Sequence, residues 1–382
     1  MAKRKATSRK SSVKARDNIG GTDIDTTKFE NIYQIGGIQT ATLDYPQPNG
    51  SPGCRVAHVN TGSGLRFTVA LDRGGDIVEA SYNQYNLAYL TPNQYKPPNP
   101  AYHHDQNWLS GWPGGLLTSC GPEYFGPPRE ENGEKISLHG RHSNTPAALE
   151  MILNPDPHRG RYEMLLSMVI RDTRLFGPHL EVRRQIQCIL GHPQIQIYDQ
   201  VTNRADTTVA HHWLYHVNPG YPLLNRGARF IYRGQCTALL PTPRTSPTAA
   251  MLNRLKRVPD AVEEHRGAGE TLLLIDPRPD RRGICHVGLV NPKIKLGFEL
   301  AYPLECLPRL GNWQHFSPEG SYVTGLEPFS GSLLGEDNDP HPLANQKLKP
   351  GQTRRYQMTI KLHTNTTDLR QLSAYDGPVR PS

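Results

Sequence analysis

Residues 180–203 read Leu180-Glu-Val-Arg-Arg-Gln-Ile-Gln-Cys-Ile-Leu-Gly-His-Pro-Gln-Ile-Gln-Ile-Tyr-Asp-Gln-Val-Thr-Asn203. Apolar side chains alternate with polar ones on both sides of the central Gly191-His-Pro193. A period of two residues is typical of a β-strand with one buried face, and the turn residues predict a hairpin. The expected strands are Leu180–Leu190 and Gln194–Asn203. This hairpin sets the fold class for the rest of the chain.

Similar strand patterns occur on both sides of this hairpin. The expected strands are Cys54–Asn60, Leu65–Leu71, Tyr162–Arg171, Val209–Val217, Thr271–Ile275, Ile284–Val290, Ile294–Leu300, Tyr322–Glu327 and Arg355–Leu362. Only one short helix is indicated, around Ala249–Arg257. Because strand follows strand without regular helices between them, the sequence predicts an all-β fold, a large antiparallel β-sandwich with few short helices.

We expect residues 22–382 to form a single domain, since all-β units can exceed 200 residues. Residues 91–133 are rich in Pro, Gly and aromatic side chains and predict an irregular region inside that domain. A long irregular segment of this kind is often a functional loop. Its tryptophans are suited either to stacking on sugar or base rings or to filling the core.

The net charge of +8 is concentrated at one end of the chain. Seven Lys and Arg residues and no acid lie within residues 1–16, so the remaining residues carry a net charge of only +1. We expect residues 1–21 to be a disordered basic tail that makes at most weak polyanion contacts. The nearly neutral body does not predict a nucleic-acid groove.

The sequence contains six scattered cysteines, no Cys-x-x-Cys motif, no secretory signal and no apolar run long enough to span a membrane. We therefore expect a cytoplasmic protein with reduced thiols. The pairs His103-His104 and His211-His212 lack the spacing of zinc ligands, so no metal and no cofactor is predicted.

Three stretches carry side chains suited to chemistry. The first, Leu138–Pro146, combines two imidazoles, a guanidinium, a hydroxyl and an amide, and is either a binding turn or a solvated one. In the second, His216 ends the strand Val209–Val217 on the same face as His212 and Leu214. Such a histidine either faces a cleft or bonds to a backbone carbonyl.

The third stretch, Tyr322–Ser330, places Glu327 after an apolar strand. A carboxylate there is either the partner of an arginine or a general base held on a rigid strand. Just before this stretch, Trp313 offers an aromatic face.

Five stretches, in this order along the chain, resemble the aldose 1-epimerase (galactose mutarotase-like) superfamily, and in particular a bacterial branch labelled as a domain of unknown function. They are Leu65–Ile77, Gly114–Gly121, Leu138–Ala147, His216–Leu223 and Gly325–Pro328, and the resemblance covers most of residues 50–363. It implies the supersandwich form of the β-sandwich, a small-molecule sugar as the partner, and no cofactor.

The resemblance also implies roles for individual residues. His139 would bind the sugar, His216 would be the general acid and Glu327 the general base of anomer interconversion. Better-known mutarotases carry an Asn-Arg pair ahead of the Leu-His-Gly histidine, and no arginine lies in Gly114–Tyr124, so Arg141 is expected to replace it. Trp313 or Trp112 would stack on the sugar ring.

Two other functions remain open at the level of sequence. The same acid–base pair would serve an isomerase, epimerase or lyase acting on a modified or keto sugar. A carbohydrate-binding protein without catalysis would need the aromatic residues but not Glu327. The sequence predicts neither the sugar nor the oligomeric state.

Overall fold

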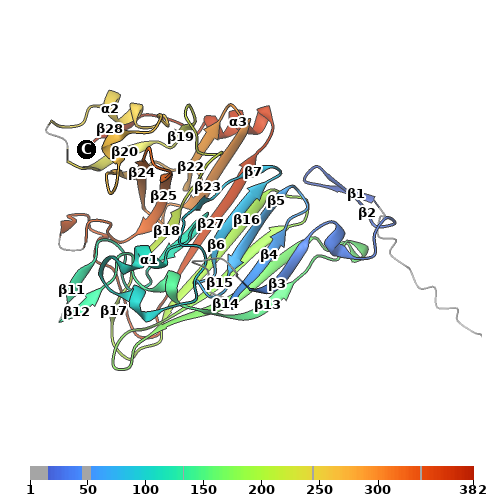
Figure 1. Ribbon diagram of the computed structural model, residues 1–382, viewed down its shortest axis with the longest axis horizontal. Coiled ribbons are helices and arrows are strands. Elements are labelled where there is room, and N and C mark those ends of the chain that lie inside the picture. The colour runs from blue at the N-terminus through green and yellow to red at the C-terminus, as the bar shows by residue number, and fades with distance from the viewer. Residues whose placement is uncertain (1–15, 45–52, 132, 243–244, 336–337) are drawn as a thin grey trace, which may run out of the picture.

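The computed structural model describes the chain except for residues 1–15, 45–52, 132, 243–244 and 336–337. Two large sheets pack face to face, which confirms the predicted antiparallel β-sandwich (Figure 1). Apart from β20 and β28, which run parallel, the paired strands are antiparallel. Among the described residues, no helix is both long and apolar enough to cross a membrane.

The larger sheet carries the candidate site on its outer face. In order across it lie β28 (Val379–Pro381), β20 (Gly234–Leu240), β21 (Thr271–Pro277), β24 (Arg309–Phe316), β25 (Tyr322–Ser330), β18 (Trp213–Val217), β10 (Leu117–Cys120), β6 (Asp76–Tyr82), β5 (Leu65–Ala70), β4 (Cys54–Asn60) and β3 (Gly37–Leu43), with β7 (Tyr85–Asn86) beside β6.

The second sheet covers the inner face of the first. Its order is β13 (Ala147–Leu153), β14 (Glu163–Thr173), β15 (His179–Ile189), β16 (Gln194–Asn203), β27 (Thr353–His363), β23 (Leu296–Pro303), β22 (Ile284–Asn291) and β19 (Arg229–Ile231). The predicted hairpin is β15 and β16, in which the buried pairs Val182–Val201 and Ile186–Ile197 lie opposite each other. The main hydrophobic core lies between the two sheets.

Smaller elements complete the chain. Short two-stranded pairs are β1 (Arg16–Ile19) with β2 (Thr22–Asp25), β8 (Tyr89–Leu90) with β9 (Gly114–Gly115), β11 (Arg129–Glu131) with β12 (Glu134–Ile136), and β17 (Val209–Ala210) with β26 (Lys347–Leu348). The α-helices are α1 (Trp108–Gly111), α2 (Ala249–Arg254) and α3 (Thr366–Ser373). Within the described residues, six 3₁₀ turns lie at Ile32–Gln34, Pro100–His103, Asp105–Asn107, His142–Asn144, Pro157–Arg159 and Glu263–His265.

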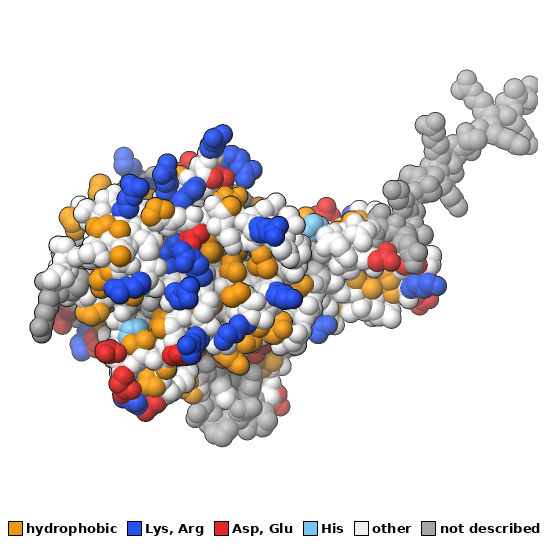
Figure 2. Space-filling model, turned by 90° about the horizontal axis from the view of Figure 1, so that it is seen from above, with side chains coloured by type: hydrophobic (Ala, Val, Ile, Leu, Met, Phe, Trp, Pro, Cys, Tyr) orange, Lys and Arg blue, Asp and Glu red, His pale blue; other side chains and the backbone are white. Residues whose placement is uncertain are grey.

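Two predictions need correction. The expected strand Val209–Val217 is divided into β17, which pairs with β26, and β18, which pairs with β10 and β25, because between them the backbone N–H of His212 donates to the carbonyl oxygen of Pro122 outside either sheet. The expected tail of residues 1–21 is too long, because Arg16–Ile19 pair with β2 across a Gly20-Gly21 turn. Residues 1–15 lie outside the described residues. On the face seen in Figure 2, Lys and Arg side chains are spread in separate groups.

Candidate active site

A cavity of about 380 Å³ opens on the outer face of the larger sheet. Strands β18, β24 and β25 form its floor and supply His216, Trp313 and Glu327. One wall comes from the irregular region, with Trp108, Trp112 and the residues Gly126–Pro128 just before β11. The cavity is therefore lined in part by residues 91–133, the irregular region that the sequence predicted as a candidate functional loop.

His216 and Glu327 face each other across neighbouring strands. Val217 of β18 lies opposite Leu326 of β25, and this antiparallel register sets His216 directly opposite Glu327 on the same face of the sheet. The His216 Nε2 lies 3.3 Å from the Glu327 Oε1, and both side chains are buried.

Two glycines make room for this carboxyl group. A Cβ at Gly325 would lie 2.0 Å from the Glu327 Oε1, and one at Gly311, opposite Glu327 on β24, would lie 3.0 Å from its Oε2. Any larger residue at Gly325 would displace the carboxyl from its place beside His216.

Burial shifts both groups of the pair toward their neutral forms. Desolvation, with the Glu270 charge second, raises the pKa of Glu327 to about 8. Desolvation lowers the pKa of His216 to about 4, which outweighs the opposite effect of the hydrogen bond that its ring donates to Asn218. The two groups therefore hold one proton between them across neutral pH, and they titrate as a pair.

His139 reaches the same cavity from a tight turn. Its backbone has φ of +58°, a left-handed conformation, and Gly140 follows with φ of +76°. This turn directs the ring at His216, with 5.6 Å between ring centroids, and at Trp108, with 5.0 Å. Burial, with His216 second, lowers the pKa of His139 to about 3, so its imidazole is neutral.

Two buried polar atoms at this cavity have no hydrogen-bond partner among the described residues. They are the Nδ1 of His139 and the Oε1 of Glu327, which lies 3.3 Å from the His216 Nε2 without forming a hydrogen bond to it. An unsatisfied buried polar atom costs about 1–3 kcal/mol, so each is an attachment point for a polar ligand.

Tryptophans supply flat apolar surface around these polar atoms. Trp108 and Trp112 stack with 5.3 Å between ring centroids, and Trp313 contacts the His216 ring edge from the other side. The Trp313 Nε1 donates to the Glu270 Oε2 at 2.7 Å, which fixes the indole. Such faces suit the C–H side of a sugar ring.

The structure brings together four of the five residues proposed from the sequence and leaves one outside. His139, His216, Trp313 and Glu327 line the cavity, whereas Arg141 lines a separate hollow and lies 3.4 Å from the carboxylate of Asp172. Gly140 and Arg141 take the chain away from the cavity, so Arg141 does not stand in for the Asn-Arg pair. Glu270 was missed, because no motif surrounds it.

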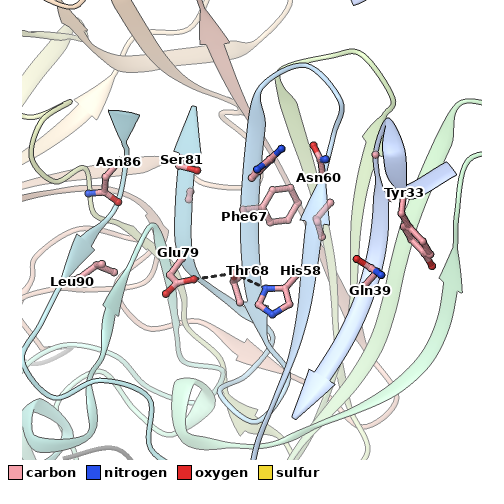
Figure 3. A pocket seen from close by; sticks show the side chains of 15 residues that line it. Tyr33, Gln39, His58, Asn60, Phe67, Thr68, Glu79, Ser81, Asn86 and Leu90 are labelled. Atoms are coloured by element: carbon pink, nitrogen blue, oxygen red, sulfur yellow. Dashed lines mark hydrogen bonds between the residues drawn. The ribbon is translucent and has the colours of Figure 1, made fainter. Parts of the chain in front are cut away.

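A larger hollow of about 560 Å³ lies elsewhere on the same sheet, over β3 to β6. Figure 3 shows His58, Thr68 and Glu79 joined there by hydrogen bonds of 3.1 Å. None of the described residues that line it has an unpartnered buried polar atom. No group of three or more His, Cys, Asp or Glu among the described residues could hold a metal ion.

Solved structures with the same fold include three from bacteria. A protein described as a putative aldose 1-epimerase from Klebsiella pneumoniae matches with a TM-score of 0.79 at 20% identity, covering 94% of this chain and 92% of that one. A galactose mutarotase-like protein from Clostridium acetobutylicum gives 0.57 at 11% identity, covering 86% and 99%. Galactose 1-epimerase from Lactobacillus acidophilus gives 0.53 at 11% identity, covering 85% and 99%.

These structural matches establish a galactose mutarotase-like fold. A search of the curated proteins found no match. A family model described as a domain of unknown function (DUF4432) matches residues 51–362, which is most of the sequence and includes all the residues that supply the floor of the cavity. The chain therefore belongs to the DUF4432 family, a branch with the galactose mutarotase-like fold.

Proposed function

We propose that the protein interconverts the anomers of a free sugar by general acid–base catalysis. The observation that carries this proposal is the pair of His216 and Glu327, with 3.3 Å between Nε2 and Oε1, at the floor of a cavity walled by tryptophans. Each positioned acid or base contributes about 10²–10⁴-fold to the rate of such a reaction.

The single proton of the pair is sufficient for a full cycle. In the form with ionised Glu327 and protonated His216, the carboxylate takes the proton of the anomeric hydroxyl while Nε2 donates to the ring oxygen. The bond from C1 to the ring oxygen breaks and leaves the open-chain aldehyde. His216 is now neutral and Glu327 carries the proton.

Ring closure uses these same groups in reverse roles. After rotation about the bond between C1 and C2, neutral His216 takes the proton of the former ring hydroxyl and Glu327 returns its proton to the carbonyl oxygen. Closure on the other face of C1 gives the opposite anomer and restores the starting form. We expect the His139 Nδ1, which has no partner among the described residues, to bond to a sugar hydroxyl.

The charges around the cavity favour an uncharged substrate. Glu270 and Glu327 both line it, and no Lys or Arg is among its described lining residues. A phosphate or carboxylate on the sugar would find no cationic side chain to pair with, and two acidic side chains would repel it. We therefore expect a neutral sugar, and expect phosphorylated sugars and uronic acids to be poor substrates.

Exchange spectroscopy by proton NMR tests the proposal. Wild-type protein is added to neutral aldoses, their phosphates and keto-sugars, and the exchange rate between anomers is compared with the spontaneous rate. We expect acceleration for at least one neutral aldose and none for its phosphate. Acceleration confined to keto-sugars, or absent for every sugar with folded protein, would contradict the proposal.

A further inference from the structure

We propose that Asn218 is a positioning residue that fixes which nitrogen of His216 carries the proton. It holds the hydrogen on Nδ1 and so leaves Nε2, the atom facing Glu327, as the one that exchanges protons. The catalytic consequence rests on the proposed function, but the arrangement of protons does not. A neutral imidazole has one donor and one acceptor nitrogen, and the partner of one decides the role of the other.

The orientation of the Asn218 amide follows from its neighbours. One terminal atom lies 3.1 Å from the carbonyl oxygen of Gly115 and 3.0 Å from that of His216. Because both neighbours are acceptors, this atom is the amide nitrogen. The other atom, Oδ1, is an acceptor, and it contacts the Nδ1 of His216. Nδ1 must therefore be the donor.

The backbone of residue 218 is held as firmly as its side chain. Its N–H donates to the carbonyl oxygen of Leu116, and its own carbonyl oxygen accepts from the N–H of Tyr89, each at 2.9 Å. Asn218 is fully buried, so water does not compete for these bonds. The amide is thus fixed before any substrate arrives.

Among the groups around the His216 ring, Glu327 is the one that can exchange a proton with Nε2. The Glu327 carboxyl from β25 faces Nε2, and the ring edges of His139, Trp112 and Trp313 complete the surroundings. Of these, only Glu327 carries a charge that changes during the proposed cycle, while Glu270 acts on Glu327 from the cavity wall.

Nitrogen-15 NMR of the histidine rings tests the proton arrangement directly. Full-length protein labelled at histidine is observed near pH 6, and the signals of His216 are assigned by comparison with His216→Gln. In wild type we expect Nδ1 to carry the hydrogen and Nε2 to be bare. A hydrogen on Nε2 in the wild-type protein would overturn the proposal, whatever reaction the protein catalyses.

Two variants of Asn218 separate positioning from structural support. Asn218→Asp retains an acceptor for Nδ1 and adds a negative charge beside it. We expect it to keep the hydrogen on Nδ1 and to move the acid limb of the pH–rate profile to higher pH. Asn218→Leu removes the acceptor, so we expect hydrogen to appear on Nε2 and kcat to fall about tenfold or more with KM nearly unchanged.

The two hypotheses fail in different ways. If wild type accelerates no anomer exchange but shows the hydrogen on Nδ1, the proposed function fails and the role of Asn218 in fixing the tautomer stands. If wild type is active and Asn218→Leu, once folded, leaves both the ring protonation and kcat unchanged, the residue is only structural and this inference is wrong.

Discussion

His216 and Glu327 share one proton over the range between their two pKa values. Below about pH 4 both groups are protonated, so no base remains, and above about pH 8 neither holds the proton, so no acid remains. We expect the enzymatic part of anomer exchange to follow a bell-shaped curve with limbs near those values. NMR exchange rates, corrected for the spontaneous reaction at each pH, measure this. A single limb, or a plateau extending beyond pH 10, would show that another group is the acid.

The buried Glu327 carboxyl should lower the free energy of unfolding as the pH rises. Its pKa is raised from the usual 4.5 to about 8, so between these values the folded state holds a proton that the unfolded chain releases. The free energy of unfolding contributed by this group therefore falls from about pH 5 to pH 8 and is then constant.

Glu327→Gln removes this loss, since an amide does not ionise. We expect the variant to gain stability over wild type between pH 5 and pH 8, with a constant difference above that range. Urea unfolding at a series of pH values measures it. A difference independent of pH would mean that Glu327 is ionised in the folded protein at neutral pH.

The sequence could single out His139, His216 and Glu327, which line one cavity, because each lies in a recognisable motif. It placed Arg141 wrongly, since a single residue after Gly140 is enough to turn a side chain out of the cavity. The bond between Asn218 and His216 spans two residues, but its meaning depends on the Gly115 carbonyl, about a hundred residues earlier. Contacts between residues so far apart in the sequence become visible only in the folded structure.

At the scale of elements, ion pairs hold the cavity wall that contains Gly126–Pro128. Arg174, in the turn between β14 and β15, pairs with Glu123 and with Glu134 of β12, each at 2.6 Å. These two acids flank Gly126–Pro128, which line the cavity. The position of this wall therefore depends on a residue that does not touch the cavity.

Arg174→Ala should loosen this wall and weaken substrate binding more than chemistry. Partly exposed pairs contribute about 0.2–1 kcal/mol, so we expect KM to rise about two- to fivefold with kcat nearly unchanged. Steady-state kinetics of anomer exchange measure both constants. Arg171→Ala, which breaks a pair with Glu181 away from the wall, is the control. An equal change in the two variants would contradict this account.

The strands were predictable where one face is buried and the period is two. β16 follows this rule along its whole length, and β15 follows it from Val182 onward. The strand expected at Val209–Val217 also alternates, but β17 pairs with β26 whereas β18 pairs with β10 and β25. Between them the His212 N–H donates to the carbonyl oxygen of Pro122, which lies in no strand. Tertiary partners of this kind override a local pattern.

At the scale of the whole molecule, a buried arginine joins the two sheets. Arg184 of β15 forms two hydrogen bonds with Asp199 of β16, and it also bonds to Ser119 of β10 and pairs with Asp76 of β6 in the other sheet. All four side chains are buried. Composition alone does not reveal this connection, because it depends on which strands face each other across the core.

Arg184→Met should destabilise the sandwich strongly, because it leaves two buried carboxylates without their partner. Loss of one side of a buried pair costs about 3–5 kcal/mol. Arg183→Met, on the adjacent and half-exposed residue that pairs with Glu150, should cost less than about 1 kcal/mol. Chemical denaturation measures both variants. Similar stabilities for the two would contradict the role given to Arg184.

The most direct test of the central claim is the rate of anomer exchange near pH 6 for three proteins on one neutral aldose that wild type accepts. They are wild type, Glu327→Gln, and Glu79→Gln, which makes the same change in the other hollow of the sheet. We expect wild type and Glu79→Gln to accelerate exchange alike, and folded Glu327→Gln to lose about 10²-fold or more. Wild-type exchange rates in Glu327→Gln would contradict the claim that this carboxyl is the base.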